Sequence, residues 1–303
     1  MSLEPLVSVC IQTYQHANYI EQCLRSVLCQ QTSFPFEIIL GEDESTDGTR
    51  EICKQFAKSY PQLIRLFLRD EKDKIWIEGE KTGRYNFISN LQAAKGKYIA
   101  LLDGDDYWTD KNKLQKQVDF LECNPDYTIC YCNYRNLKKG RLKTTLYLHR
   151  RKRDFYIHNI PLMHTGAVVF RNPGFEILPD HFWQTPFLDF PLYMHVTGAG
   201  KIHRLKDYMV VYREHDAGMW SSKSREQQLL KYNSVYLKML PVYSGETVAY
   251  LVQKLEKNVR ALFDIYAKEN NIGKAEQLAR QISSDENLKF RKPLQKYMLR
   301  YSV

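Results

Sequence analysis

The sequence predicts an α/β fold in which a mostly parallel sheet carries helices on both faces. Apolar runs of strand length alternate with segments of helical periodicity from residue 6 to about residue 135. The first run, residues 6–12, contains no charged side chain, as expected of a strand covered on both faces. This alternation favours parallel strands joined by helical crossovers.

Each element of the first half follows from its own pattern. The expected strands are short apolar runs, at residues 6–12, 37–40, 64–68, 98–103 and 127–134. The expected helices repeat apolar residues every three or four positions, at residues 20–28, 49–60, 85–94 and 114–121. Asn18 and Glu21 have the spacing of a capping box for the first helix, and Asp47-Gly48-Thr49 opens the second.

After residue 138 the alternation becomes irregular. Lys138-Lys139-Gly140 predicts a turn between two strands. The next expected elements are strands at 165–170, 201–205 and 208–213, with a helix at 188–196. Beyond Trp220 the pattern is helical, with a stripe that continues to about residue 270, a helix at 273–282 and a basic tail. We therefore expect one α/β domain at 1–220 and a helical region at 221–303.

The composition is that of a soluble globular protein, with 44% hydrophobic and 26% charged residues among 303. No apolar run approaches the ~18 residues that span a bilayer, and no secretory signal precedes Val7, so we expect a cytoplasmic protein. The seven cysteines are odd in number and are expected to be reduced. Cys130-Tyr131-Cys132 has no second pair, which argues against a zinc site.

The net charge of +9 predicts anionic partners, such as phosphates, nucleic acid or an acidic membrane surface. Residues 149–153 form one basic cluster, which we interpret as a solvated loop. The tail at 288–301 mixes basic and large apolar residues. It fits either a surface that lies on an anionic membrane or a solvated chain end.

Asp103-Gly104-Asp105-Asp106 directly follows the apolar run 98–102. Like charges repel, and burial makes that repulsion worse. A divalent cation bound to a diphosphate would relieve it, because hard cations take oxygen ligands. If the strand geometry continues, residues 103 and 105 point to the same side, and Gly104 lets a ligand approach the backbone. The alternative is a solvated acidic turn.

Polar residues also follow two other expected strands, at 13–14 and at 41–47. In open α/β sheets, ligands bind beyond the carboxyl ends of the strands. Two common phosphate-binding motifs are excluded. Residues 198–201 lack the first glycine and the final hydroxyl residue of a P-loop, and no Gly-x-Gly-x-x-Gly follows the first strand.

Four segments in this order resemble family 2 glycosyltransferases of the GT-A fold: 8–14, 19–28, 37–49 and 96–108. The resemblance covers about residues 6–220. It implies a GT-A catalytic domain at 1–220, with a nucleotide-sugar half at about 1–110, an acceptor half at about 111–220, and a helical C-terminal appendage.

The resemblance implies a role for each residue that matches a family motif. Asp43 matches the carboxylate that accepts from a base N–H, and Thr13 and Tyr14 match the loop that lines the base pocket. Asp103 matches the residue near the donor ribose, Gly104 leaves the donor room, and Asp105 matches the metal ligand, for Mn²⁺ or Mg²⁺.

Asn86 and Lys95 are further candidates for nucleotide contacts. Many relatives carry an Arg-Asn pair upstream of the position of Gly96. This chain has no arginine there, only Arg84 slightly earlier.

The later motifs imply the remaining roles. Residues 188–192 resemble the segment that carries the catalytic base, which we assign to Asp189, although a helix N-cap is the alternative and Asp180 a weaker candidate. Residues 212–215 resemble the motif in which a histidine completes the metal site. We expect His215 to be that ligand and Arg213 to contact a phosphate. Residues 218–222 suit a mobile lid, and 164–166 resemble the stretch beside the acceptor cleft.

The resemblance implies an inverting transfer from a nucleotide-diphosphate sugar, most often a UDP-sugar, to a saccharide or lipid-linked saccharide in cell-surface polysaccharide synthesis. No nucleic-acid partner is expected. The protein could lie at the inner face of the cell membrane through 288–301, and the helices at 225–284 either pack on the catalytic domain or form a homodimer surface.

Two alternatives stay open at this point. A nucleotidyltransferase that makes sugar nucleotides would need a glycine-rich loop where residues 13–18 stand. The other alternative is a basic membrane or nucleic-acid binding module without activity.

Overall fold

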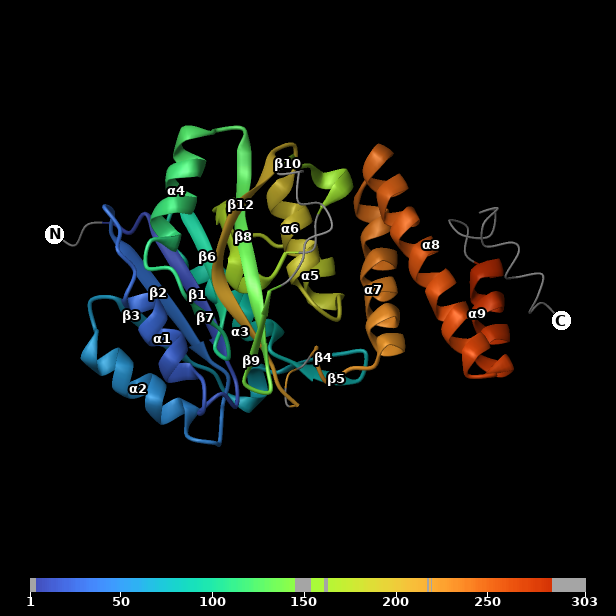
Figure 1. The fold of residues 1–303 in the computed structure, drawn as a ribbon, viewed down its shortest axis with the longest axis horizontal. Coiled ribbons are helices and arrows are strands. Elements are labelled where there is room, and N and C mark those ends of the chain that lie inside the picture. The colour runs from blue at the N-terminus through green and yellow to red at the C-terminus, as the bar shows by residue number, and fades with distance from the viewer. Residues whose placement is uncertain (1–3, 145–153, 161–162, 217, 219, 285–303) are drawn as a thin grey trace. The chain divides into compact units, whose positions relative to one another are not determined.

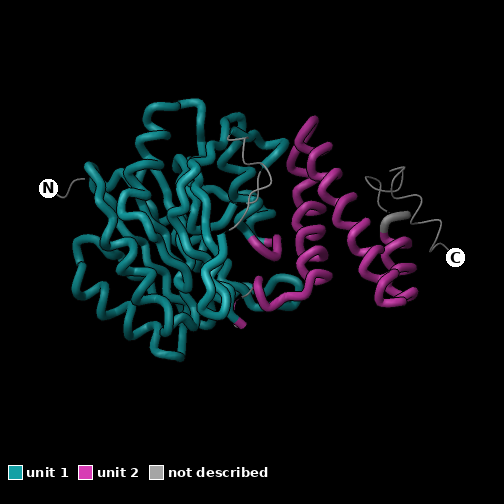
Figure 2. The backbone as a smooth tube through the Cα atoms, viewed as in Figure 1, with its two compact units in different colours: residues 1–183, 188–215 teal, residues 184–187, 216–303 magenta. Residues whose placement is uncertain are grey.

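The computed structural model describes residues 4–144, 154–160, 163–216, 218 and 220–284. The chain divides into two compact units, one of residues 1–183 and 188–215, the other of 184–187 and 216–303 (Figure 2). The basic cluster 149–153 and the tail 288–301 lie outside the described residues.

The first unit is built on a ten-stranded sheet with the strand order β10-β12-β8-β11-β6-β1-β2-β3, while β7 pairs with β12 and β9 with β8 (Figure 1). Its parallel half consists of β1 (Val7–Thr13), β2 (Phe36–Glu42), β3 (Ile64–Leu68) and β6 (Tyr98–Asp103). Its other half consists of β7 (Tyr107–Trp108), β8 (Tyr127–Lys138), β9 (Arg141–Thr144), β10 (Asp154–Phe155), β11 (Val168–Arg171) and β12 (Lys201–Glu214). β11 pairs with β6 on one side and with β8 on the other, antiparallel to each, and so joins the two halves.

Helices cover both faces of the sheet, as predicted. The helices of this unit are α1 (Ile20–Leu28), α2 (Thr49–Ser59), α3 (Arg84–Ala93), α4 (Lys113–Cys123), α5 (His181–Gln184, shared with the second unit) and α6 (Asp189–Thr197). Val7, Val9 and Ile11 belong to the core that α1, α2 and α4 close. Cys10 points to the opposite face, where its thiol lies 3.5 Å from the carbonyl oxygen of Asn90 on α3.

Several expected elements differ in detail. The predicted strands 201–205 and 208–213 form the single strand β12, whose pairing with β8 shifts register between Arg204 and Val210. The predicted strand 165–170 begins with a 3-10 turn, Thr165–Ala167, before β11. A hairpin of β4 (Ile75–Ile77) and β5 (Glu80–Thr82) was not predicted.

The predicted capping box of Asn18 and Glu21 is wrong. Tyr19 occupies the N-cap of α1, and no side chain caps the helix. The turn at Lys138-Lys139-Gly140 is confirmed, because Lys139 and Gly140 take the positive φ angles of 48° and 72° that a two-residue hairpin turn requires.

The described part of the second unit is helical, with α7 (Arg225–Met239), α8 (Gly245–Lys268) and α9 (Ile272–Ser284). The predicted stripe is buried along α8, including Leu251, Leu255, Val259 and Leu262. Among the described residues, no helix is both long and apolar enough to cross a bilayer. All seven cysteines are free thiols.

Candidate functional site

The carboxyl ends of β1, β2 and β6 meet at one edge of the sheet. Thr13 is in register with Glu42, and Gln12 with Asp103. The loops that follow are joined as well, because the Asp43 N–H donates to the Thr13 carbonyl at 3.0 Å and the Gly104 N–H to the Gln12 carbonyl at 2.9 Å. The three polar strand ends found in the sequence therefore share one edge.

Asp103 ends β6 with its carboxylate held by Gln12, whose amide nitrogen donates to it at 2.6 Å. Burial raises the pKa of Asp103 to about 8, and the charges of Asp105 and Asp106 contribute to the rise. Without a bound cation, the three carboxyl groups of the acidic turn are therefore not all ionised easily at once. A bound cation would reverse that preference.

Asp105 behaves in the opposite way. Burial disfavours its ionisation, but the hydrogen bond with His215 and the nearby His16 outweigh burial and lower the pKa of Asp105. Its Oδ2 lies 3.0 Å from Nε2 of His215 and 3.7 Å from Nε2 of His16. Two imidazoles and one carboxylate thus face one another at this edge.

His16 was not identified from the sequence. Its Nδ1 lies 3.2 Å from the Thr13 hydroxyl, and its backbone N–H donates to the Thr49 hydroxyl at 2.8 Å. These contacts turn Nε2 toward Asp105. Only its place two residues after Tyr14 hinted at a role.

Gly104 is required by the close approach of two residues of the chain itself. A Cβ at this position would stand 2.5 Å from the Thr13 hydroxyl oxygen and 2.9 Å from Nδ1 of His16. The absent side chain therefore leaves space for two residues of the chain itself. A contact of Gly104 with the donor stays a prediction.

Asp106, which had no predicted role, connects the acidic turn to two distant segments. Its Oδ1 accepts from the backbone N–H of Arg213 at 2.8 Å, and its Oδ2 lies 3.2 Å from Nε2 of His164. Burial raises the pKa of Asp106, and His164 opposes the rise. Asp106 therefore positions the turn and is not exposed to a ligand.

Arg213 also holds the turn. Its guanidinium donates to the backbone carbonyl of Asp105 and to the side chain of Gln22, and its centre lies 4.5 Å from the ring centroid of Tyr107. The predicted phosphate contact would require some of these bonds to be exchanged.

Asp105 and His215 fit the cation that the family implies. Among the residues that the structure describes, no group of three His, Cys, Asp or Glu side chains could hold a metal by itself. The pair supplies one oxygen and one nitrogen ligand, so a cation here would complete its shell with donor phosphate oxygens and water. The imidazole makes this set better suited to Mn²⁺ than to Mg²⁺, which prefers oxygen ligands and dehydrates reluctantly.

Asp43 opens the loop after β2, and its carboxylate is paired with Lys74 at 2.6 Å. Burial raises the pKa of Asp43, whereas the hydrogen bond from Lys74 lowers it. The ammonium group of Lys74 also lies 4.1 Å from the ring centroid of Tyr14. Lys74 was missed because it stands in a loop without a recognisable motif.

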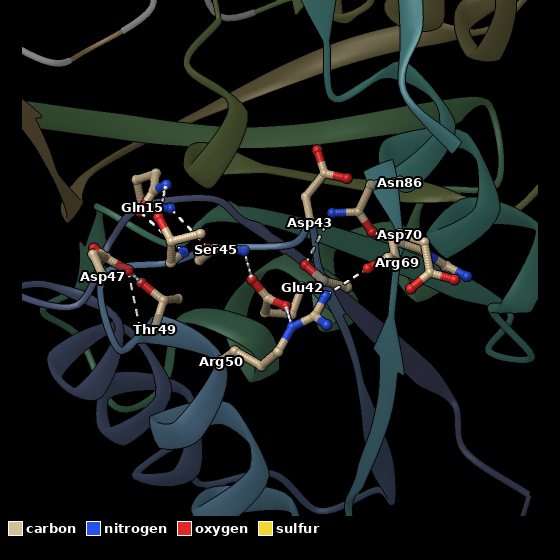
Figure 3. A network of polar contacts seen from close by, with 12 residues as sticks. Gln15, Glu42, Asp43, Ser45, Asp47, Thr49, Arg50, Arg69, Asp70 and Asn86 are labelled. Carbon is tan, nitrogen blue, oxygen red and sulfur yellow. Dashed lines mark hydrogen bonds and ion pairs between the residues drawn. The ribbon is translucent and has the colours of Figure 1, made fainter. Parts of the chain in front are cut away.

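Two other carboxylates of this loop, Glu42 and Asp47, are bonded to neighbouring residues, as Figure 3 shows. Glu42 is fully buried, pairs with Arg50 and accepts from the Ser45 N–H at 2.6 Å. Asp47 accepts from the N–H and the hydroxyl of Thr49 at 3.0 and 2.6 Å. These bonds fix the loop that carries Asp43.

Asn86 anchors α3 to β2. Its amide nitrogen donates to the Gly41 carbonyl at 2.9 Å, and its oxygen accepts from Nε of Arg69 at 3.2 Å (Figure 3). Both polar groups of Asn86 are thus engaged inside the protein. Arg69, from the loop after β3, brings a guanidinium to α3, where the sequence offered only Arg84.

Lys95 does not belong to this edge. It precedes β6, whereas Asp103 ends it, and its backbone N–H donates to the Ser8 hydroxyl near the start of β1. Because β1 and β6 are parallel, Lys95 lies at the opposite edge of the sheet. We therefore remove Lys95 from the predicted donor site.

Asp189 is the first residue of α6, and the alternative that it caps this helix is wrong, because Leu188 occupies the N-cap. Burial raises the pKa of Asp189, and the positive charges of His164 and Arg84 oppose the rise. The pKa of Tyr193 is raised by burial and by the charges of both Asp189 and Asp103. Asp189 therefore interacts electrostatically with His164, which also pairs with Asp106 of the acidic turn.

Comparison with known proteins places the chain in a family. It matches Glycosyl transferase family 2 over residues 8–178. It is 34% identical over 223 residues to the uncharacterised protein Rv1520 of Mycobacterium tuberculosis, which covers 71% of this chain and 61% of the relative. The chain thus spans about three fifths of that relative's length. It is also 39% identical over 119 residues to the putative teichuronic acid biosynthesis glycosyltransferase TuaG of Bacillus subtilis, which covers 39% and 42% of the two chains.

Two solved structures share the fold. TarS of S. aureus in complex with UDP-GlcNAc superposes with a TM-score of 0.63 at 17% identity, covering 91% of this chain and 79% of TarS. The mannosyltransferase PcManGT of Pyrobaculum calidifontis, in complex with GDP-Man and Mn²⁺, superposes with a TM-score of 0.55 at 16% identity, covering 98% of this chain and 86% of PcManGT. The predicted GT-A fold is confirmed, and the chain belongs to glycosyl transferase family 2.

Proposed function

We propose that the protein is a metal-dependent, inverting glycosyltransferase in cell-surface polysaccharide synthesis. Its donor would be a nucleotide-diphosphate sugar, with a UDP-sugar as the first candidate, and its acceptor a hydroxyl of a saccharide or lipid-linked saccharide. The observation that carries this proposal is the pair of Asp105 and His215, 3.0 Å apart at the sheet edge where Asp43 and Asp103 also lie.

The comparisons support the same class of reaction. TuaG is named for teichuronic acid biosynthesis, TarS was solved with UDP-GlcNAc, and PcManGT with GDP-Man and Mn²⁺. UDP and GDP therefore both remain donors to test, and the mixed oxygen and nitrogen ligands favour Mn²⁺ as the cation.

In the proposed reaction Asp189 accepts the proton of the acceptor hydroxyl. The acceptor oxygen then bonds to the anomeric carbon while the bond from that carbon to the diphosphate breaks. This inverts the configuration of the anomeric carbon. Burial suits Asp189 for this role, because a base with a raised pKa takes a proton more readily. Charge neutralisation on the leaving diphosphate is the chemistry that a cation supplies when bound at Asp105 and His215.

A screen of UDP-, GDP- and dTDP-sugars with Mn²⁺ would test the proposal, first by thermal shift and then by nucleotide release with cell-envelope oligosaccharides as acceptors. Proton NMR of the product should show the anomeric configuration opposite to that of the donor. Retention of configuration, or the absence of any sugar transfer, would contradict the proposal.

Asp189→Asn should lower the transfer rate by ~10²–10⁴-fold, because it removes the base but keeps the shape of the side chain. Asp180→Asn is the matched control, since Asp180 is exposed and we expect full activity from that variant. Equal activity of the two variants would remove Asp189 from the mechanism. Both should unfold at the temperature of the unmodified protein to within a few degrees.

A further inference from the structure

The hairpin of β8 and β9 lies beside the last residues of β12 and gathers cations on one face (Figure 1). Its register places Lys138 opposite Arg141, and Asn136 opposite Lys143. Residues directly opposite in an antiparallel pair share a face of the ribbon, and side chains two apart on a strand point the same way. Lys138, Arg141 and Lys143 therefore share one face, which we call the cationic face.

The neighbouring strand β12 continues the cationic face. Glu214 is in register with Lys138, and Tyr212 with Asn136. Glu214 accepts from Nζ of Lys138 at 2.9 Å and from the amide of Asn136 at 2.6 Å. The hydrogen bond from Lys138 lowers the pKa of Glu214, and the charge of Lys143 adds to the effect. Glu214 thus balances one of the three cations, and among the described residues the face keeps a net positive charge.

Three aromatic rings connect this face to the acidic turn. Tyr134 and Tyr212 have ring centroids 5.0 and 4.6 Å from that of His164. Nε2 of His164 lies 3.2 Å from Oδ2 of Asp106, and the charge of His164 acts on Asp189. Because each strand residue advances ~3.3 Å, the cations at the end of β8 begin ~13 Å from Tyr134. An extended ligand along this face would therefore reach from the rings to the cations.

The exposed apolar side chain of the hairpin points to the opposite face. Leu142 is 49% exposed and pairs with Leu137. A surface that lies on an anionic bilayer inserts apolar side chains and keeps its cations around them. This hairpin instead separates the two kinds of side chain, so its cationic face fits a hydrated, charged ligand better than a membrane.

Resting on the proposed function, we propose that the cationic face binds an anionic acceptor, a saccharide chain that carries phosphate or carboxylate groups behind the unit that receives the sugar. The rings hold the reacting end near Asp189, and Arg141 and Lys143 bind the negative groups further along the chain. Charge-assisted hydrogen bonds from arginine and lysine are strong contacts for both anions. A neutral saccharide of the same length would gain nothing from these cations.

Calorimetric titration of the full chain compares a hexamer of galacturonic acid with its methyl ester, which keeps the sugar chain but removes the charge. A hexamer of glycerol phosphate is the phosphate counterpart. The unmodified protein should bind at least one charged hexamer ~10-fold more tightly than the methyl ester, and added salt should weaken that binding. Arg141→Gln with Lys143→Gln should remove most of the difference, whereas Arg141→Lys with Lys143→Arg should keep it.

Lys54→Gln with Lys58→Gln is the matched control, because both lysines are exposed on α2 and the variant loses the same net charge. It should bind the charged hexamers as the unmodified protein does. Circular dichroism and thermal unfolding check that the variants fold. If the double glutamine variant of the hairpin does not fold, Lys143→Gln alone replaces it, with an expected ~3-fold loss of affinity for the charged hexamers.

The proposal is wrong if neither charged hexamer binds more tightly than the methyl ester, if the hairpin variant keeps the difference, or if the control variant loses as much. It is also wrong if the hairpin variant loses binding only to phosphatidylglycerol vesicles, measured against phosphatidylcholine vesicles, because the face would then contact a membrane. Failure of the proposed function is a different result, in which no sugar is transferred from any donor, whatever the affinity for the hexamers.

Discussion

Two acidic loops stand at neighbouring strand ends and treat their carboxylates differently. The loop 42–47 follows β2, and the loop 103–106 follows β6. In the first, Glu42 is bound by Arg50 and Ser45, and Asp47 is bound by Thr49 and by the Ala17 N–H. In the second, Asp105 faces two histidines from distant parts of the chain. Glu42 and Asp47 therefore hold their own loop in place, whereas Asp105 faces imidazoles that can share a cation with it.

The largest effect should come from Asp105→Asn, because Asp105 offers its carboxylate to a cation. We expect the transfer rate to fall ~10³-fold, since a metal at a leaving group contributes several kcal/mol. The unfolding temperature should change little. Chelation of divalent cations should abolish transfer in the unmodified protein, and Mn²⁺ should restore it more fully than Mg²⁺.

Asp119→Asn is the control for this variant, because Asp119 is exposed on α4, where its carboxylate accepts from the Gln115 amide at 2.7 Å. A variant Asp105→Asn that still responds to Mn²⁺ with full activity would show that the loop 103–106 does not hold the cation.

Glu42→Gln should affect stability instead. Breaking a buried ion pair by removing one partner typically costs ~3–5 kcal/mol, because the other charge remains buried. Chemical denaturation would measure that loss. The double variant Glu42→Gln, Arg50→Met should regain part of it, and a fully stable single variant would remove the structural role assigned to this loop.

Lys113 contrasts with the paired charges of both loops. It is a buried charge without a hydrogen-bond partner among the described residues. Burial lowers its pKa to about 8, from about 10.5 when unfolded. Above pH ~10.5 the side chain is neutral in both states, and stability is lost as the pH falls through the folded pKa near 8.

Lys113→Met should therefore stabilise the protein by on the order of 2–3 kcal/mol at pH 7, and the gain should shrink as the pH rises from 8 toward 10.5. Thermal unfolding across this range measures it, with the exposed Lys116→Met as control. If the stability gained on Lys113→Met does not change with pH, Lys113 does not carry a buried charge in the folded protein.

The smallest effect is expected for Asp106→Asn. Asp106 belongs to the loop 103–106, but both of its carboxylate oxygens are engaged inside the protein, by Arg213 and His164, as the carboxylates of Glu42 and Asp47 are. An asparagine keeps one acceptor, so we expect a loss of ~1–2 kcal/mol in stability and a modest loss of transfer. A loss of transfer as large as that of Asp105→Asn would assign Asp106 to the ligand site.

Much of the fold could be predicted, because strands and helices follow from the spacing of neighbouring apolar residues. The alternation of strand and helix patterns predicted the parallel half of the sheet. Because β1, β2 and β6 are parallel, Thr13, Asp43 and Asp103 lie at one edge. The irregular half was predicted less well. The register shifts of β12 depend on its pairing with β8, which local spacing does not encode.

The sequence by itself determined which carboxylates follow which strands, and the motifs that place the chain in its family. Only the tertiary structure decided which of those carboxylates are already bound, that His16 and Lys74 join the site, and that Lys95 lies at the other edge. The physical reason is distance along the chain. Hydrogen bonds and ion pairs of residues far apart in sequence depend on strand order and loop geometry, and these are fixed only when the sheet assembles.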